Sequence, residues 1–429
     1  MKKTIALNID CKKEMGIIKP MHCINNIPNV HADSPLIKEC NIPYTRLHDT
    51  GGAYGGGVYV DVPVIFRNFN ADENDPASYD FAFTDDLLKH IEASGMTPYY
   101  RLGVTIENHC RIKAYNIYPP VDFNKWARIC EHILAHYTEG WADGFFYKIE
   151  YAEIWNEPEN NILDPMNNPC WRGTKEQFFE MYKIAARHLK NRFPNIKIGG
   201  YGSSGFYSAI GKNANPWANV KGRYDNFVIF FTDFLQYISD KETYAPLDFF
   251  SWHSYGSVDD NIQFAEFCRK TLDKYGFNKT ESHLNEWNPG IMQRGLLKDA
   301  SDICANMIEL QKSSTDMAMY YAAETRMTYC GLFDPLGNPH YAYYVFRAFG
   351  ELYGGIQTAC QGQENGIYAL AAVKDGKNYI LVTNNTSRKK SVKLNVTAKR
   401  ARVIGKKIAF KEKEFNGYIG AYEVWLIEF

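Results

Sequence analysis

The sequence lacks the patterns of two large protein classes. No apolar run in its 429 residues is long enough to span a bilayer, so no membrane-spanning helix is expected. Its 48 basic and 49 acidic side chains almost cancel, whereas a general nucleic-acid binder usually carries a basic excess. We therefore expect no membrane partner and no nucleic-acid partner.

Cysteine pairs, a Gly-rich nucleotide motif after the first expected strand and a serine-hydrolase motif are missing as well. No two of the ten cysteines form a Cys-x-x-Cys pair, so a zinc or redox site has no support. No Gly-x-Gly-x-x-Gly follows the first expected strand, and no Gly-x-Ser-x-Gly elbow occurs. We expect neither a metal nor an organic cofactor.

The amino-terminal residues lack the apolar stretch of about 7–15 residues that a signal peptide carries. They alternate instead, with Ile5, Leu7 and Ile9 on one side, as in a strand. A chain of this length can build its core without disulfides, so the scattered cysteines are read as reduced thiols. Both features predict a cytoplasmic protein.

What the sequence does contain is a repeated order of strand, loop and helix from about residue 15 to residue 355. The clearest helix is 121–140, whose apolar positions recur at three and four residues. Eight strands alternating with helices predict a parallel sheet closed into a (β/α)8 TIM barrel, an α/β fold. The expected strands are residues 15–24, 42–52, 96–104, 147–160, 196–202, 247–256, 282–290 and 316–325.

The pattern changes after residue 355. A hairpin signal at Asp375-Gly376 and several short strands predict a small, β-sandwich-like antiparallel domain over residues 356–429. Residues 1–14 have no partner at the start of the barrel, so we expect their strand to join this sheet. Residues 15–355 then form the barrel, and the Gly-rich segment 51–57 is expected to be a flexible loop over its site.

Two carboxylates stand out where barrel strands are expected to end. Glu157 ends the fourth strand and Glu286 the seventh, and each follows an Asn. One protonated and one ionised carboxyl facing each other across a barrel mouth can split a glycosidic bond. For either residue alone, an ion pair with a neighbouring Arg or Lys is the alternative. Glu281 and Glu153 are placed too early in their strands to compete, whereas Glu159 could reach the site as a rival acid/base.

Two short segments resemble known catalytic motifs. IWNEPE (154–159) resembles the acid/base motif of clan A glycoside hydrolases. LNEWN (284–288) resembles the nucleophile segment of glycoside hydrolase family 39, which includes β-xylosidases and α-L-iduronidases. The helix 121–140 and the segment 331–346 also look like parts of that family. The resemblance implies a barrel with a small accessory β domain.

The resemblance also implies a role for each matching residue. Glu157 would be the general acid/base, Glu286 the nucleophile, and Asn156 would hydrogen-bond the sugar 2-hydroxyl. Tyr255 would donate a hydrogen bond to Glu286, and Arg46 would lie beneath that carboxylate. The remaining candidates for sugar binding are His48, His253, Glu324 and Trp287.

Strand alternation and the expected strand ends also predict where the neighbours of these residues point. Asn156 and Glu157 are adjacent, so both can face the site only if the strand bulges or twists there. Asn285 stands where the family often has Thr, and alternation would point it away from the site. Trp287 lies past the expected strand end and could stack on a sugar ring.

The predicted function is therefore a retaining exo-glycosidase that hydrolyses short oligosaccharides by double displacement, most similar to a β-xylosidase. An α-L-arabinosidase, a β-glucosidase and a uronidase are the alternatives. A uronidase would need extra basic groups, for which the loops offer Lys113, Arg172 and Arg326.

Two alternatives come from other classes. The intact carboxylate pair argues against a carbohydrate-binding protein without catalysis. The missing nucleophile elbow and metal cluster argue against a hydrolase of amides or esters. Because many barrels of this kind associate, a homo-oligomer is also expected.

Overall fold

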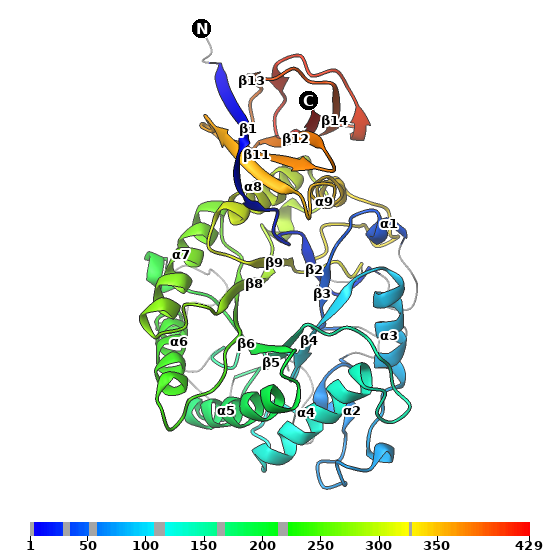
Figure 1. Ribbon diagram of the computed structural model, residues 1–429, viewed down its shortest axis with the longest axis vertical. Helices are drawn as coiled ribbons and strands as arrows, with labels where there is room; N and C mark the ends of the chain where they lie inside the picture. Colours follow the sequence, from blue (N-terminus) through cyan, green and yellow to red (C-terminus); the bar gives the residue numbers. More distant parts are fainter. Residues whose placement is uncertain are drawn as a thin grey trace.

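The computed structural model describes residues 4–28, 35–50, 58–106, 116–160, 168–212, 222–325 and 328–429. It consists of a barrel with a smaller β domain stacked on one side of it (Figure 1). The Gly-rich segment 51–57 lies outside the described residues, as do Lys113 and Arg326. In the part of the chain that is described, no helix has the length and apolar character needed to cross a membrane.

The larger part is the expected closed barrel of parallel strands. Its interior is filled at the amino ends of the strands by a cluster that includes Tyr99, Tyr151 and Phe249. Aromatic residues make up 15% of the chain, and some of them therefore belong to the core. The strands are β2 (Cys23–Asn25), β3 (Tyr44–Arg46), β4 (Thr97–Leu102), β5 (Tyr151–Ile154), β6 (Lys197–Ser203), β7 (Phe249–Ser254), β8 (Glu281–Trp287) and β9 (Met317–Tyr320).

Helices cover the outside of the barrel, and polar side chains fix where several of them begin. Thr174 and Gln177 form a capping box at the start of α5, and Ser257 and Asp260 form another at the start of α7. The α-helices are α1 (Pro35–Lys38), α2 (Val62–Ile65), α3 (Ala82–Ala93), α4 (Phe123–Thr138), α5 (Lys175–Arg192), α6 (Arg223–Ser239), α7 (Val258–Lys274), α8 (Leu297–Lys312) and α9 (Tyr341–Gly350). Short 3₁₀ helices are η1 (Pro76–Ser78), η3 (Tyr207–Ile210) and η4 (Ile291–Gln293).

The first expected barrel strand, 15–24, is divided between the two parts of the molecule. Residues 15–17 end β1 (Ile5–Ile17), which belongs to the accessory sheet, and the barrel begins only at Cys23. Pro20 lies between them and has no N–H to donate to a strand partner. The first strand of the accessory sheet therefore continues to Ile17, three residues beyond the boundary expected at residue 14.

The smaller part is one nine-stranded sheet that curls around its own apolar core. Its strand order is β15-β14-β17-β12-β11-β10-β1-β13-β16, so β1 lies inside the sheet, antiparallel to β10 and parallel to β13. The arrangement differs from the two facing sheets of a β-sandwich, because successive strand pairings join all nine strands into one sheet. The strands are β10 (Ile356–Gln361), β11 (Ile367–Lys374), β12 (Lys377–Asn384), β13 (Lys390–Leu394), β14 (Arg400–Gly405), β15 (Ile408–Glu412), β16 (Tyr418–Ile419) and β17 (Val424–Glu428).

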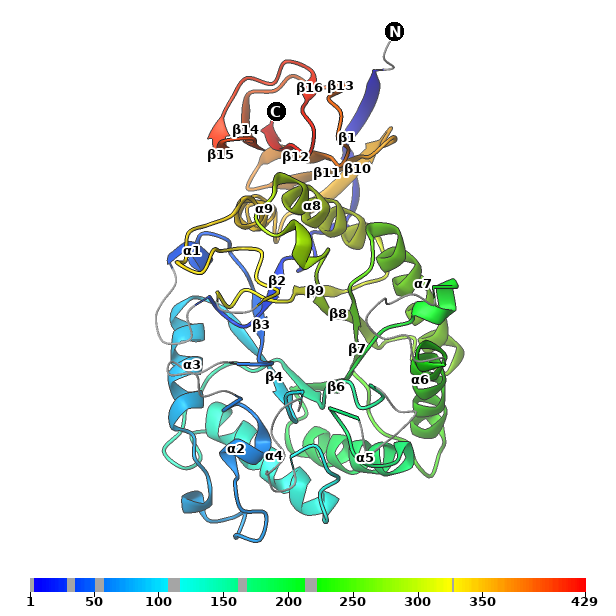
Figure 2. The same ribbon diagram turned by 180° about the vertical axis from the view of Figure 1, so that it is seen from behind.

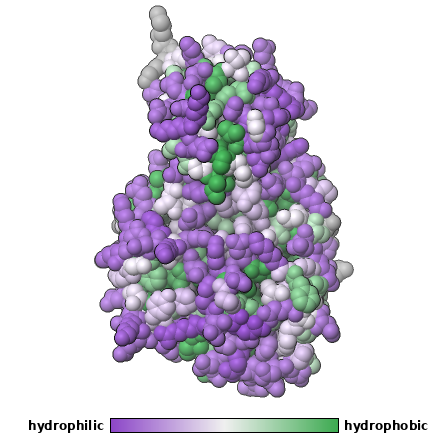
Figure 3. Space-filling view, viewed as in Figure 1, coloured by the Kyte–Doolittle hydropathy of each residue, from purple (hydrophilic) through white to green (hydrophobic). Residues whose placement is uncertain are grey.

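Helices α8 and α9 lie between the barrel and the accessory sheet (Figure 2). Arg402 of β14 donates to Glu351 just beyond α9 at 2.7 Å, and the Ser301 and Thr383 hydroxyls of α8 and β12 are 2.8 Å apart. The surface is largely hydrophilic on the face that Figure 3 shows, with an apolar strip over the accessory sheet. The accessory sheet is thus fixed to the side of the barrel rather than to its mouth.

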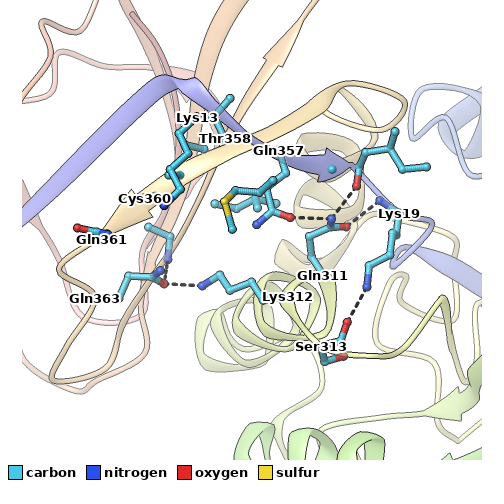
Figure 4. Close-up of a pocket in the computed structure, with 17 residues that line it drawn as sticks. Lys13, Lys19, Gln311, Lys312, Ser313, Gln357, Thr358, Cys360, Gln361 and Gln363 are labelled. Atoms are coloured by element: carbon cyan, nitrogen blue, oxygen red, sulfur yellow. Dashed lines mark hydrogen bonds between the residues drawn. The ribbon is translucent and has the colours of Figure 1, made fainter. Parts of the chain in front are cut away.

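A cavity of about 580 Å³ lies at this junction (Figure 4). Gln311 donates to the carbonyl of Ile17 and to Gln357 Oε1, both at 2.9 Å. Lys19 Nζ donates to the carbonyls of Ser313 and Thr315, and burial lowers the pKa of Lys19 to about 8. These polar groups already pair with one another, so they join the sheet to the barrel.

Candidate active site

Glu157 and Glu286 come together at the carboxyl ends of the barrel strands, from β5 and β8. One oxygen of each carboxylate and one ring nitrogen of His253 all lie within 4.8 Å of one another. His253 Nδ1, at the end of β7, is 2.8 Å from Glu157 Oε1 and 3.5 Å from Glu286 Oε2. Both carboxylates are largely buried, at 8% and 6% exposure. The imidazole therefore bridges two acids in a site of low dielectric.

The end of β5 turns sharply, which lets two neighbouring residues face the site. Trp155 and Glu157 both have positive φ angles, 76° and 46°. The Glu157 N–H donates across to β6, to the carbonyls of Tyr201 and Gly202. Regular alternation is therefore broken after Ile154, as the adjacency of Asn156 and Glu157 required.

A bulge in β8 does the same for Glu286. The pairing of β7 with β8 slips by one residue between Leu284 and Glu286, so Asn285 is the extra residue. Its side chain points into the barrel, where Nδ2 donates to Glu153 Oε1 at 2.6 Å. The expectation that Asn285 faces away is wrong, because alternation does not hold through a bulge.

Arg46 and Tyr255 hold the Glu286 carboxylate from below and from the side. Tyr255 donates its hydroxyl to Oε1, and Arg46 Nη1 donates to Oε2 at 3.2 Å. Burial and the charge of Glu286 hold the pKa of Tyr255 well above its ordinary value, so the tyrosine remains a donor. Arg46 is fully buried; burial opposes its charge, but Glu153 and Glu286 overcome this and raise its pKa.

The opposite carboxylate has a different environment. Burial favours its neutral form, but the hydrogen bond and charge of His253, together with Asn160, outweigh burial and lower the pKa of Glu157. Asn160 Nδ2 donates to Glu157 Oε2 at 2.8 Å, and Arg223 donates in turn to Asn160 Oδ1. Burial would lower the pKa of His253, but Glu286 and Glu157 raise it. The pKa of Glu157 is thus lowered and that of His253 raised, the directions expected for a carboxylate paired with an imidazolium.

Asn156 lies beside both acids. Its Oδ1 accepts from Arg46 Nη2 at 2.7 Å, and its buried Nδ2 has no hydrogen-bond partner among the described residues. Gly202 makes room for it, because a Cβ there would lie 3.3 Å from Asn156 Oδ1 and 3.1 Å from His253 Nε2. The amide nitrogen of Asn156 is thus a donor ready for a ligand.

The other expected sugar-binding residues, His48, Glu324 and Trp287, are all buried. His48 is buried beside Arg46, and burial together with that charge holds its pKa well below the ordinary value, so its ring is neutral. Glu324 is nine-tenths buried beyond β9, where its charge acts on Tyr59 and Cys330. Trp287 is fully buried in the core.

The expectation that Trp287 binds a sugar is therefore wrong. β8 continues through this residue, and its ring packs edge-on against Tyr320. Tyr329 is the aromatic residue that reaches the site instead: it is 37% exposed, and the charges of Glu286 and Glu157 both act on its hydroxyl. Its ring centroid is 5.5 Å from that of Tyr255.

Two acidic residues near the site, Glu153 and Asp49, were not assigned a role from the sequence. Glu153 is fully buried under it and accepts from Arg46 Nε at 2.7 Å. Alternation from the inward-facing Tyr151 could have placed Glu153 inside the barrel, where a charge needs a partner. Asp49 lies just past β3, where no periodicity remains to reveal its direction.

Glu159, considered as a rival acid/base, is fully buried away from the pair. Its Oε1 accepts from Ser203 Oγ and Ser204 N at 2.9 and 2.7 Å. Burial and the charge of Glu157 raise the pKa of Glu159 to about 7.

The ligand atoms of Glu157, His253 and Glu286 are close enough together to hold a metal ion. However, Arg46 and Tyr255 already donate to both oxygens of Glu286, and a guanidinium at this position competes with a cation. The donor set fits a protonated imidazole between two carboxylates better than a divalent metal.

His132 and His136 lie four residues apart on α4, a spacing that suits two ligands of one metal ion, but each contacts a different side chain instead. The first lies 3.2 Å from the Tyr79 hydroxyl, and the second lies 3.0 Å from Asp85.

The closed barrel and its facing carboxylates place the chain among the barrel-type glycoside hydrolases. The sequence model of glycosyl hydrolases family 39 matches residues 39–350, and the chain belongs to this family. A β-xylosidase of Geobacillus stearothermophilus is 26% identical over 231 residues, which are 51% of this chain and 39% of that relative. A β-xylosidase of Caldicellulosiruptor saccharolyticus is 25% identical over 215 residues, 46% of this chain and 40% of the relative.

Solved structures share the whole architecture. A glucosidase from Croceicoccus marinus superposes with a TM-score of 0.75 at 22% identity, over 99% of both chains. A monomeric β-xylosidase from Caulobacter crescentus superposes with a TM-score of 0.67 at 15% identity, again over 99% of both chains. At these identities the similarity shows the fold.

Proposed function

We propose that the protein is a retaining exo-glycosidase that hydrolyses short oligosaccharides by double displacement. The observation that carries this proposal is the approach of the two carboxylates, with one oxygen of each within 4.8 Å. Retaining glycosidases hold their carboxyl groups about 5–5.5 Å apart, whereas inverting enzymes need about 6.5–9.5 Å to admit a water. The short separation supports direct attack by a carboxylate on the sugar.

In this mechanism, Glu286 attacks the anomeric carbon while Glu157 gives a proton to the departing oxygen. Arg46 and Tyr255 donate hydrogen bonds to the two oxygens of Glu286 and hold the carboxylate in position, which suits a nucleophile. Glu157 then acts as a base on the water that releases the sugar from Glu286. The proton count is balanced, because the water returns to Glu157 the proton that the leaving group took.

His253 supplies the proton that Glu157 lacks at rest. Its Nδ1 is 2.8 Å from Glu157 Oε1, and the lowered pKa of Glu157 beside the raised pKa of His253 supports a shared proton that rests on the imidazole. As the glycosidic oxygen gains negative charge, the proton moves along this short hydrogen bond to Glu157 and then to the leaving group. The acid is therefore the pair rather than the carboxyl alone.

The first substrate class to test is the β-xylosides. Two curated relatives are named β-xylosidases, although the matches span only about two fifths of their length. α-L-Arabinosides and β-glucosides are the next candidates. Asn156 Nδ2 is the donor that we assign to the sugar 2-hydroxyl, and the neutral His48 is assigned to a further hydroxyl. A cytoplasmic location and a homo-oligomeric state stay predictions.

A panel of nitrophenyl glycosides tests this proposal. The expected result is hydrolysis of one or more glycosides, with NMR showing that the first-formed sugar keeps the anomeric configuration of the substrate. Glu286→Gln and Glu157→Gln should each reduce turnover by orders of magnitude while the thermal transition remains. Inversion of configuration, or full activity of Glu286→Gln, would disprove the mechanism. Saturable binding without product release would indicate a carbohydrate-binding protein.

A further inference from the structure

A third carboxylate, Asp49, stands beside the nucleophile and has no role in the mechanism above. It follows His48 just beyond the end of β3. Tyr321, just beyond β9, donates its hydroxyl to Asp49 Oδ2 at 2.6 Å. The other oxygen, Oδ1, is buried and has no hydrogen-bond partner among the described residues; His48 Nε2 is 3.4 Å away. Only 17% of the Asp49 side chain is exposed.

Asp49 lies on the same wall of the site as the nucleophile. The ring of Tyr321 is 5.4 Å from that of Tyr329, which is 5.5 Å from that of Tyr255, the donor to Glu286. Burial and the charge of Glu286 raise the pKa of Asp49 to about 6, so the two carboxylates are electrostatic neighbours. A buried acceptor oxygen without a donor is costly, and such an atom beside an active site is a candidate to accept a hydrogen bond from the ligand.

The charges around Asp49 leave an excess of negative charge on this wall. Arg46, the nearest buried cation to Glu286, is 2.7 Å from Glu153. Arg101, which also acts on Asp49, is 2.5 Å from Asp61. Both guanidinium groups already have a carboxylate of their own, and the imidazole of His253 is shared between Glu157 and Glu286, so the charge of Asp49 is not fully compensated.

We propose that Asp49 is a specificity-determining residue: Oδ1 accepts a hydrogen bond from a ring hydroxyl of the sugar held against Glu286, and its charge selects neutral glycosides over glycosides of uronic acids. This inference rests on the proposed glycosidase function. A carboxylate can only accept hydrogen bonds, so its partner must be a donor such as a sugar hydroxyl. A uronate carboxylate would instead meet two like charges, which is how a binding site rejects a wrong ligand.

The variant Asp49→Asn tests both parts of the proposal. It keeps an oxygen for Tyr321 but removes the charge and weakens the acceptor. Asp233→Asn is the matched control, because Asp233 pairs with Lys175 on the outside of the barrel. Thermal melts of both variants establish that they are folded.

The assay compares kcat/KM on three kinds of nitrophenyl glycoside: the best neutral substrate, its monodeoxy analogues, and the corresponding uronide. Asp49→Asn should lose about 10- to 100-fold on the parent, the range expected for a hydrogen bond to a charged group. One monodeoxy analogue should cost the wild type a similar factor and cost Asp49→Asn almost nothing further. The ratio of uronide to neutral activity should rise at least about 10-fold.

Equal losses by Asp49→Asn on the parent and on every deoxy analogue, with an unchanged uronide ratio, would overturn the proposal. So would wild-type kinetics in the variant. If the wild type hydrolyses no glycoside, the proposed function fails by itself. Calorimetric binding of the same parent and deoxy sugars then still decides whether Asp49 binds a hydroxyl.

Discussion

Substitution of Glu153 tests how the residues beneath the site are held together. It is fully buried beneath Glu286 and receives three hydrogen bonds, from Arg46 Nε at 2.7 Å and from Ser251 Oγ and Asn285 Nδ2 at 2.6 Å each. Both Glu153 oxygens are used, and every partner is a donor. A glutamine would turn an N–H toward one of these donors and leave the Arg46 charge with Glu286 alone.

Glu153→Gln should therefore destabilise the protein by about 3–5 kcal/mol, the usual effect of breaking a buried ion pair from one side. That is a large part of the total stability of about 5–15 kcal/mol of a typical domain. Denaturant unfolding followed by both tryptophan fluorescence and circular dichroism measures the change. kcat should fall too, because Arg46 would no longer hold Glu286 in place.

Glu150→Gln is the control, since it lies at the other end of the barrel. Glu150 is partly exposed and bonds to Tyr44 and Lys148, so its loss should change stability by less than about 1 kcal/mol. A stability of Glu153→Gln within about 1 kcal/mol of the wild type would mean that Glu153 and Arg46 do not form a buried ion pair on which folding depends.

Three further substitutions test the geometry of the pair. His253→Ala leaves the proton on Glu157 alone, so the basic limb of the kcat/KM–pH profile should move to lower pH by about 1–2 units; an unchanged limb would mean that His253 does not share the proton. Gly202→Ala puts a methyl group 3.1 Å from His253 Nε2 at a φ of +64°, so kcat should fall by about 10-fold or more while the protein stays folded; wild-type kcat would contradict this. Tyr255→Phe removes a donor to Glu286 and should reduce kcat/KM by about 10- to 100-fold, unlike Tyr244→Phe on the surface.

The sequence predicted the barrel because strands and helices leave periodic signals. Glu157 lies just past β5 and Glu286 lies near the end of β8, so their common edge follows from parallel topology, whereas their roles came from the resemblance of the two motifs. The accessory strand β1 was also visible, but its end was not, because residues 12–17 are exposed and carry no alternating pattern.

The errors come from places where the backbone departs from regular geometry. The bulge in β8 reversed the expected direction of Asn285, and the extension of β8 through Trp287 buried a ring expected to bind sugar. Asp49 has a φ of +54°, a conformation that strand alternation cannot anticipate. Contacts such as Glu153 with Arg46 join residues more than a hundred positions apart, and no local pattern encodes them.

Trapping the covalent intermediate tests directly whether Glu286 is the nucleophile. Incubation with an activated 2-deoxy-2-fluoro glycoside of the preferred sugar slows release of the sugar from the enzyme, and mass spectrometry of the digested protein locates it. The expected result is one sugar per chain, attached to Glu286. Attachment to Glu157, to Glu159 or to any other side chain would contradict it.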